Sequence, residues 1–379
     1  NRIDYITIAS EGDSVDFGDM IQARYYTASA SSSTRAVTMG GLAPSAPASN
    51  VIEYVEIATL GNALDFGDMS SGRLTDGAAF SSHIEAFVCG GYPATNDSYE
   101  VIKIASTGNS ITSDKVSSGN QWPGAGCSNS TRGIWAGGYT ESPNVKVDVI
   151  EFVTIANSSN TTDFGNLTVA RGHLAGMCNS TRGVFANGTT NPSPHPVVNT
   201  IDYITIATAG NATNFGDSTT ASKPMGGGRS STTRGIFTLG NAPSAVNTIE
   251  YITIASTGDS QDFGDLTGFS GWGKGAGNIS SGTRAILGGG HEALNNIEYI
   301  TIATLGNGTD FGDLIGGRRS AFTAGSKTRG VFGGGKNPSQ LNSIEYIEIA
   351  TTGNALDFGD MINSKSFASG LSDCHGGLS

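Results

Sequence analysis

The fold is decided by residues 296–342, which read NIEYITIATLGNGTDFGDLIGGRRSAFTAGSKTRGVFGGGKNPSQLN. The rest of the chain consists of variations on these residues. The residue that opens each copy of the IEYITIA segment recurs every 47 to 51 positions, at Ile3, Ile52, Tyr99, Ile150, Ile201, Ile249, Ile297 and Ile344. Self-similarity at this period is typical of a repeat architecture, so we expect a single domain over residues 1–379.

Each repeat contains four short segments that favour β-strands. Residues 297–303 are rich in β-branched and aromatic side chains, and residues 309–314 carry one large apolar side chain, Phe311. Residues 320–325 are small, and residues 328–334 run into glycines. No window keeps the helical period for the ten or so residues that a helix needs. The repeat therefore predicts four antiparallel strands.

Four strands at this period fit an all-β fold, a β-propeller in which each repeat is one blade around a central axis. The innermost strands of a propeller are crowded, so the Gly, Ala and Ser segments such as 27–32 and 320–325 should lie nearest the axis. The TRGVFGGG strand should be second, IEYITIA third and the DFGD strand outermost.

The number of blades follows from counting strand types. The first residues supply only the third and fourth types, in 3–9 and 16–20, and the last supply only the first two, in 366–372 and 374–379. These halves are complementary, so we predict an eight-bladed ring in which the N- and C-terminal strands share one blade. A seven-bladed ring with a loose half-repeat at each end is the alternative. An open solenoid would leave unpaired strand edges at both ends.

The copies TRGVFGGG (328–335), TRGIWAGG (131–138) and TRAILGGG (283–290) resemble the Kelch strand that ends in a glycine pair. Phe311 stands where Kelch propellers usually have tryptophan, and an arginine after the outer strand also matches loosely, as Arg24, Arg73, Arg171 or Arg318. The DFGD phrase departs from the Kelch pattern. Arrays of IEYITIATxGNAxDFGD are similar to repeat proteins among bacteriophage virion and tail-associated proteins, over essentially the whole chain.

The phage resemblance implies an extracellular, virion-borne propeller, such as a tail fibre component, with a structural or receptor-binding role. Its partners would be other virion proteins or a host-surface glycan. A secreted or cell-surface bacterial lectin or adhesin is the alternative.

Composition limits the partners further. The net charge of −12 argues against sequence-independent nucleic-acid binding, which relies on lysine and arginine. No apolar run approaches the ~18 residues that would span a bilayer, so we expect no membrane insertion. Four cysteines, Cys89, Cys127, Cys178 and Cys374, show no metal-ligand spacing. We expect most of them to be buried, with one or two able to pair under oxidising conditions.

Two charged positions recur along the chain. An acid follows the opening residue of every repeat, as Asp4, Glu53, Glu100, Glu151, Asp202, Glu250, Glu298 and Glu345. An arginine begins the preceding strand as Arg35, Arg132, Arg182, Arg234, Arg284 and Arg329, with Glu85 and His375 as the exceptions. Since the second and third strands are neighbours, we predict structural ion pairs between the two sets, such as Arg182 with Asp202.

No motif in the chain predicts catalysis. DFGD shares letters with the kinase magnesium motif, but it recurs around the ring without the partner motifs of a kinase, so we interpret its phenylalanine as a packing residue. The flanking acids, such as Asp310 and Asp313, could hold calcium, yet they lack the alternating ligands of a dedicated loop. No nucleophile, base and orienting residue occur together. We therefore expect a non-enzymatic protein without a cofactor.

Binding is the better hypothesis, and loop length indicates where. Antiparallel alternation places the connections after the second and fourth strands on one face, and that face has loops of varied length, at 42–50, 92–98, 139–148, 189–199 and 291–296. Aromatic and polar side chains there could stack on sugar rings or contact a protein. The candidates are Tyr92, Tyr139, Trp122, Trp272 and His195. The alternative is that each is simply a solvated loop residue.

Overall fold

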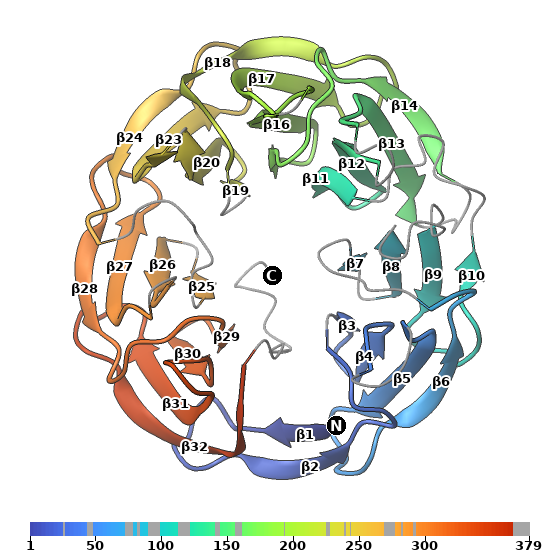
Figure 1. Ribbon diagram of the computed structural model, residues 1–379, viewed down its shortest axis with the longest axis vertical. Helices are drawn as coiled ribbons and strands as arrows, with labels where there is room; N and C mark the ends of the chain where they lie inside the picture. Colours follow the sequence, from blue (N-terminus) through green and yellow to red (C-terminus); the bar gives the residue numbers. More distant parts are fainter. Residues whose placement is uncertain are drawn as a thin grey trace.

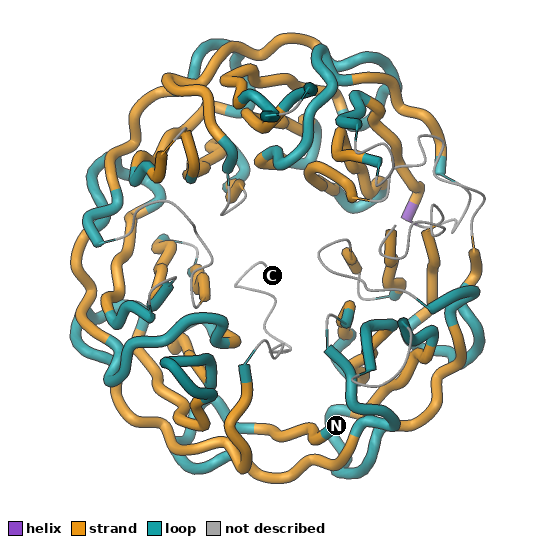
Figure 2. Tube along the Cα trace, in the orientation of Figure 1, coloured by secondary structure: helices purple, strands orange, loops and turns teal. Residues whose placement is uncertain are grey.

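The computed structural model describes the chain except for residues 26, 44–47, 73–78, 82–83, 90–98, 113–121, 141–144, 156–160, 193, 225–227, 239, 243, 269–276, 282, 291–292 and 367–379. The strands follow one another around a ring (Figure 1), joined by turns and loops (Figure 2). The described residues form no α-helix, and so none of them makes a helix of the length and apolarity needed to cross a membrane. The all-β propeller prediction is confirmed.

Seven antiparallel four-stranded sheets form the blades. The first blade consists of β3 (Ala28–Ser31), β4 (Arg35–Met39), β5 (Val51–Glu56) and β6 (Leu64–Asp68). The second consists of β7 (Ala79–Ser81), β8 (Glu85–Cys89), β9 (Tyr99–Lys103) and β10 (Ile111–Thr112). The third consists of β11 (Trp122–Ser128), β12 (Arg132–Tyr139), β13 (Val149–Thr154) and β14 (Thr162–Asn166). The fourth consists of β15 (Ala175–Cys178), β16 (Arg182–Thr189), β17 (Val197–Thr205) and β18 (Thr213–Ser222).

The remaining blades complete the circuit. The fifth consists of β19 (Gly228–Ser230), β20 (Arg234–Thr238), β23 (Thr248–Thr253) and β24 (Gln261–Asp265), with the small hairpin β21 (Asn241–Ala242) and β22 (Ser244–Ala245) in one connection. The sixth consists of β25 (Gly277–Ser280), β26 (Arg284–Gly288), β27 (Asn296–Thr301) and β28 (Thr309–Asp313). The seventh consists of β29 (Phe322–Gly325), β30 (Arg329–Gly333), β31 (Leu341–Glu348) and β32 (Leu356–Lys365).

The order of strands within a blade matches the prediction from side-chain size. In the sixth blade the hydrogen-bonded order is β25, β26, β27, β28, with the small-residue strand β25 nearest the axis and the DFGD strand β28 on the outside (Figure 1). The glycine-rich inner strands allow the blades to approach closely at the axis. In β15, a Cβ added at Gly176 would lie 2.5 Å from the Gly126 carbonyl oxygen of β11.

The eight-bladed prediction is not supported. The N-terminal strands β1 (Arg2–Tyr5) and β2 (Val15–Asp19) form a two-stranded sheet, located between β32 and the first blade (Figure 1). Among the described residues this position has only the third and fourth strand types. The segments expected to supply the first two, 366–372 and 374–379, lie outside the described part of the chain except for Ser366. The propeller therefore has seven complete blades, as in the alternative, but its N-terminal half-repeat is held in the ring rather than loose.

Each described junction between neighbouring blades repeats one set of hydrogen bonds on the outside of the ring. At one junction the Gly306 N–H donates to the Phe263 carbonyl at 2.8 Å, and the Asp265 N–H donates to Asn307 Oδ1 at 3.0 Å. The glycine-to-phenylalanine bond recurs as Gly12 to Phe358, Gly61 to Phe17, Gly108 to Phe66, Gly210 to Phe164, Gly258 to Phe215 and Gly353 to Phe311. The GN turn and the DFGD strand recur in the sequence because each binds the other across a junction. Two of these bonds fix the N-terminal sheet between its neighbours.

The DFGD motif acts in packing. Phe311 is buried and meets the Tyr299 ring edge to face at 5.9 Å between centroids. A bulge opposite the start of β27 turns this side chain inward, and Asp310 Oδ1 accepts the Gly312 N–H at 3.0 Å. Gly312 has a φ of 138°, and a Cβ there would lie 2.4 Å from the Gly353 carbonyl group. Only glycine fits at this contact between blades.

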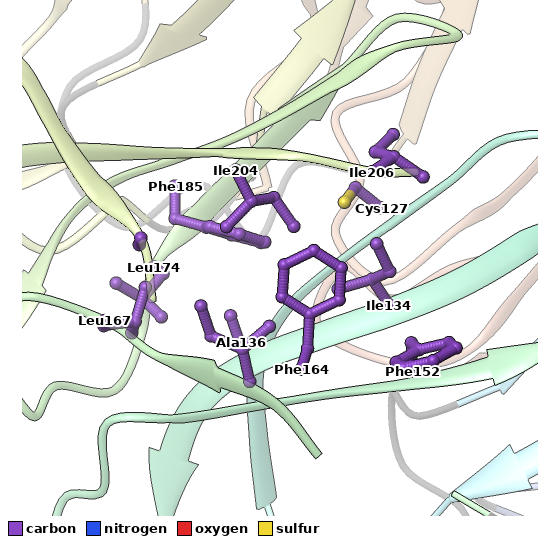
Figure 3. Close-up of a cluster of buried hydrophobic side chains, with 12 residues drawn as sticks. Cys127, Ile134, Ala136, Phe152, Phe164, Leu167, Leu174, Phe185, Ile204 and Ile206 are labelled. Carbon is purple, nitrogen blue, oxygen red and sulfur yellow. The ribbon is translucent and has the colours of Figure 1, made fainter. Parts of the chain in front are cut away.

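The space between blades is filled by large apolar side chains. Figure 3 shows this core between the third and fourth blades, where Ile134 and Phe164 of one blade meet Phe185 and Ile204 of the other. Burial of each such side chain stabilises the fold by about 1.5–3 kcal/mol. Both faces of a blade are covered in this way, which explains why the third strand is apolar at consecutive positions.

Two cysteines face each other across the same junction. Cys127 of β11 is buried in the core of Figure 3, and Cys178 of β15 packs against that core; both are free thiols. A hydrogen bond from Cys127, with a smaller contribution from the Ser128 backbone, lowers the pKa of Cys178 to about 6 against the opposing effect of burial. The same thiol pairing and burial raise the pKa of Cys127.

Candidate binding site on the loop face

The recurrent acids hold the chain where it crosses from one blade to the next. Glu298 accepts hydrogen bonds from the N–H and the hydroxyl of Thr267 at 2.9 and 2.7 Å, and Asp202 accepts the same pair from Thr168 at 3.2 and 2.6 Å. Glu250 accepts from Thr219 and Ser260, Glu100 from Ser70 and Ser110, and Glu151 from the Trp135 ring N–H. These carboxylates are buried and already bound, so they serve the architecture.

Three of the acids also bind a buried arginine, but it is not the predicted one. Arg171 Nη2 lies 2.7 Å from Asp202 Oδ2, and both side chains are 0% exposed. The equivalent pairs are Arg24 with Glu53 and Arg318 with Glu345, while Asp4 pairs with Lys365. The arginine that follows the outer strand therefore makes the buried ion pair.

Arg182, the predicted partner of Asp202, has a different role. Its Nη1 donates to the Ile254 carbonyl of the next blade at 2.8 Å, and its guanidinium lies over the Tyr203 ring at 4.3 Å. Arg35, Arg132, Arg234, Arg284 and Arg329 make the same bond to the carbonyls of Ile104, Ile206, Ile302, Ile349 and Ile8. The register explains the correction, because Arg182 is opposite Thr205 whereas Asp202 is opposite Phe185.

The connections after the second and fourth strands do share one face, which we call the loop face. The Gly138 N–H donates to the Arg171 carbonyl at 2.9 Å, and the Gly172 N–H donates to the Thr189 carbonyl at 2.9 Å, so both kinds of connection are bonded together. Tyr139 ends β12 on this face. His195 lies in the connection between β16 and β17.

The other three candidates are placed incompletely. Trp122 begins β11 and its backbone is in register with Tyr139, while its side chain is outside the described part. Tyr92 and Trp272 also lie outside the described residues. Of the five candidates, the structure therefore places the side chains of Tyr139 and His195.

Tyr139 is already engaged by two side chains. His173 stacks on its ring with centroids 5.7 Å apart and planes 28° apart, and Lys146 Nζ lies over the ring at 4.9 Å from its centroid. The Lys146 backbone is held from the next blade, since its N–H donates to Asn191 Oδ1 and its carbonyl accepts from Asn191 Nδ2, both at 3.1 Å. Stacking of a sugar on Tyr139, as expected from the sequence, would have to displace one of these groups.

Two histidines belong to the same group. His173 Nδ1 lies 3.2 Å from the Thr189 hydroxyl oxygen. The same hydroxyl donates a hydrogen bond to the Gly172 carbonyl at 3.4 Å. His195 has a φ of 60°, a strained conformation for this residue, and its Nδ1 is buried without a hydrogen-bond partner among the described residues. His173 also has a positive φ, but Ser320 adopts it at the equivalent position of the seventh blade, so that feature belongs to the repeat.

Several basic side chains lie close enough together to affect one another's pKa. Burial, followed by Lys223, Lys146 and His195, lowers the pKa of His173 to about 4. Burial and then Lys223 lower the pKa of Lys146. We call Tyr139, Lys146, His173, His195 and Lys223 the basic cluster. It lies on a chain whose net charge is −12.

Sequence reasoning missed Lys146, His173 and Lys223. Lys146 is within the variable loop 139–148, so it could have been named beside Tyr139. His173 and Lys223 follow outer strands of two successive blades, and their convergence depends on how far each connection extends over the loop face. That distance is not encoded in any local pattern.

Two open hollows of the described surface are weaker candidates. One of about 450 Å³ on the seventh blade has Arg318, Glu345 and Asp357 as its charged lining residues, and the first two bind each other. One of about 430 Å³ lies where Ser281, Arg284 and Lys327 meet. No group of three or more histidine, cysteine, aspartate or glutamate side chains within the described residues could hold a metal ion.

No protein-family model matches the chain, and none of the curated proteins matches it. The β-propeller assignment rests on the strand arrangement, and the basic cluster has to be interpreted from its own chemistry.

Proposed function

We propose that this propeller is a non-enzymatic structural or receptor-binding component of a bacteriophage virion, which binds a host-surface glycan or another virion protein through its loop face. The observation that carries the proposal is the basic cluster, in which Tyr139, His173 and Lys146 are in contact and Lys223 and His195 are near enough to lower the pKa of His173. The Kelch-like and phage-like character of the repeats supports the propeller's placement on a virion, where repeated blades give a rigid platform for varied loops.

The arrangement suits recognition better than chemistry. The recurrent acids and arginines are bound in the junctions between blades, and the basic cluster combines imidazole, ammonium and phenol groups without a carboxylate among its five members. Acid and base catalysis generally needs a titratable pair with separated roles. A secreted or cell-surface lectin or adhesin uses the same loop-face binding and is the second candidate.

Two measurements test the proposal. A glycan array probed with the purified chain should show binding that is lost when Tyr139 and Lys146 are replaced together by alanine and methionine. Mass spectrometry of purified virions should then detect the chain, which separates the virion component from the adhesin. Hydrolysis or modification of an array glycan by the chain would overturn the non-enzymatic assignment.

The matched control is Lys336→Met, which should leave glycan binding unchanged. Lys336→Met is suitable because Lys336 pairs through its backbone with Arg319 and Gln340 in the corresponding loop of the seventh blade, far along the ring from the basic cluster. Equal loss of binding in this variant would show that the loop face as a whole, rather than the cluster, attracts the glycan. Absence of binding to any glycan, with the chain still present in virions, would leave the protein partner as the function.

A further inference from the structure

We propose that Cys127 and Cys178 form a reversible disulfide bond between the third and fourth blades, so that the pair is a site of covalent modification by a low-molecular-weight disulfide such as oxidised glutathione. The sequence predicts only that one or two of the four cysteines can pair. The structure specifies which two, whatever ligand the loop face binds.

The first observation is the position of the Cys127 sulfur. A Cβ added to Gly183 would lie only 2.7 Å from Cys127 Sγ. Gly183 is the direct partner of Cys178 in the ladder between β15 and β16. Side chains of such partners lie on the same face of a sheet, with their Cβ atoms about 4.5–5.5 Å apart. The Cys127 sulfur therefore takes the place of a side chain at Gly183, beside the side chain of Cys178.

The second observation is the direction of the Cys178 side chain. Its Sγ lies 3.4 Å from the carbonyl oxygen of Ser128, the residue after Cys127, so it points out of the fourth blade toward the third. Cys127 donates a hydrogen bond to Cys178 across this junction. A disulfide needs two side chains that are directed toward each other across a short gap, and both sulfurs meet that requirement.

The third observation is that the repeat itself does not require these thiols. At the next junction the place of Cys127 is taken by Met177, whose Sδ lies 2.7 Å from a Cβ added at Gly235. The residue in register with Gly235 is Ser230, which takes the place of Cys178. The other blades have serine or glycine at that register position, as Ser31, Ser81, Ser128, Ser280 and Gly325. Methionine and serine build the same contact, so packing alone does not explain two facing cysteines.

The two thiols differ in a way that sets the order of reaction. Cys178 is partly exposed and has a pKa of about 6, so it is largely a thiolate at neutral pH, whereas Cys127 is buried. The Cys178 thiolate attacks one sulfur of oxidised glutathione, and one glutathione thiolate leaves. Cys127 then gives its proton to solvent and attacks the Cys178 sulfur of the mixed disulfide, and the second glutathione thiolate leaves. Two cysteines are oxidised to one disulfide, and one glutathione disulfide is reduced to two thiols.

Peptide mapping of the oxidised chain provides the test. The folded chain is incubated with oxidised glutathione, its remaining thiols are blocked with N-ethylmaleimide, and the tryptic digest is analysed by mass spectrometry without reduction. The four cysteines lie on separate tryptic peptides, 74–103, 116–132, 172–182 and 366–379. We expect a cross-link between 116–132 and 172–182. It should exceed the mixed disulfide of Cys178 by about tenfold, because Cys127 is held beside Cys178.

Two variants and a second measurement control the test. Cys127→Ala should retain glutathione on Cys178 and form no cross-link. Cys178→Ser has the residue found in other blades and should form neither product at this junction. The melting temperature of the unmodified chain should rise by about 5 °C on oxidation, because the bond closes residues 127–178 into a loop and restricts the unfolded chain. Dithiothreitol should reverse this rise, and Cys127→Ala should not show it.

Several results would overturn the proposal. One is glutathione retained on Cys178 of the unmodified chain while Cys127 is blocked by maleimide, which would show that the two sulfurs do not meet. A cross-link from either thiol to the peptide of Cys89 or Cys374 would assign the pairing differently. A cross-link that forms only in urea would belong to the unfolded chain, and absence of both adduct and cross-link would show that Cys178 is not a site of modification.

Discussion

The junction between the third and fourth blades has the same outer contacts as the other described junctions but differs from them inside and on the loop face. On the outside, the Gly210 N–H binds the Phe164 carbonyl as its equivalents do elsewhere. The core of this junction holds both cysteines whose side chains the structure describes, Cys127 and Cys178, and the loop face over it holds both described histidines. The contacts shared by the described junctions hold the ring together, whereas those confined to one junction can serve a separate role.

The largest expected effect is on a shared contact of the architecture. Replacing Arg171 by methionine leaves the Asp202 carboxylate buried without its cation, and both side chains are 0% exposed. We expect a loss of about 3–5 kcal/mol in the free energy of unfolding, measured by urea titration.

Arg182→Met is the matched control for that variant. It removes a part-buried bond to the Ile254 carbonyl and a contact with the Tyr203 ring, but leaves no buried charge unpaired, and should cost only about 1–2 kcal/mol. If Arg182→Met destabilised the chain more than Arg171→Met, the assignment of the buried pair would be wrong.

The next effect tests whether the junctions are equivalent. A Cβ at Gly165, at the third and fourth blades, or at Gly264, at another junction, would lie 2.5 Å from a neighbouring carbonyl group. Each alanine substitution should lower the free energy of unfolding by about 1–3 kcal/mol beyond the cost of a positive φ for alanine. The two losses should agree to within about 0.5 kcal/mol.

Gly306→Ala isolates the steric part of that loss. Gly306 has a φ of 151° but nothing within 4 Å of an added Cβ, so it carries the strain alone. Thermal or urea unfolding of the three variants makes the comparison. A Gly165 variant much milder than the Gly264 variant would show that the specialised junction is also built differently on the outside.

A smaller effect concerns the cysteine pair. Since the pKa of Cys178 is about 6, its thiolate predominates at neutral pH, and the rate of alkylation should fall by half as the pH falls through that value. In Cys127→Ala the hydrogen-bond donor is removed, so the midpoint should move up toward the ordinary value of 9.0. Mass spectrometry of alkylated peptides over a pH series measures both midpoints. A midpoint near 9 in the unmodified chain would contradict the close pairing of the two thiols.

The smallest effect on stability is expected in the basic cluster. Lys146→Met keeps the length of the side chain and removes its charge over the Tyr139 ring, so the free energy of unfolding should change by about 0.5–1 kcal/mol. Urea unfolding beside Lys336→Met measures it. A loss as large as that of Arg171→Met would mean that the cluster supports the ring, and the contrast between shared and specialised contacts would fail.

The sequence contains most of the fold but not its count of blades. Period, strand type and side-chain size predicted four antiparallel strands per blade and their order from the axis, because these depend on local residues. Blade number depended on whether residues after Lys365 complete the sheet of β1 and β2, which strand counting assumed and the described structure does not show.

The buried ion pairs were assigned to the wrong arginine for a related reason. Arg171 and Arg182 both lie within one repeat of Asp202, and sequence spacing does not distinguish them. Strand register does, because Arg182 is opposite Thr205, three residues or about 10 Å along the strand from Asp202. For the candidate site, variable loops led to Tyr139 and His195, whereas Lys223 joins them only through the folding of separate connections.

The N-terminal sheet affects how the ring can form during synthesis. Asp13 accepts a hydrogen bond from the N–H of Asp360, a residue 347 positions later. At roughly 5–20 residues per second, the strands made first must wait on the order of tens of seconds for the partner that covers them. Until then β1 and β2 present an unpaired edge, which a ribosome-associated chaperone would have to shield in the nascent chain. Closure of the ring is also the step at which two incomplete molecules could exchange these strands.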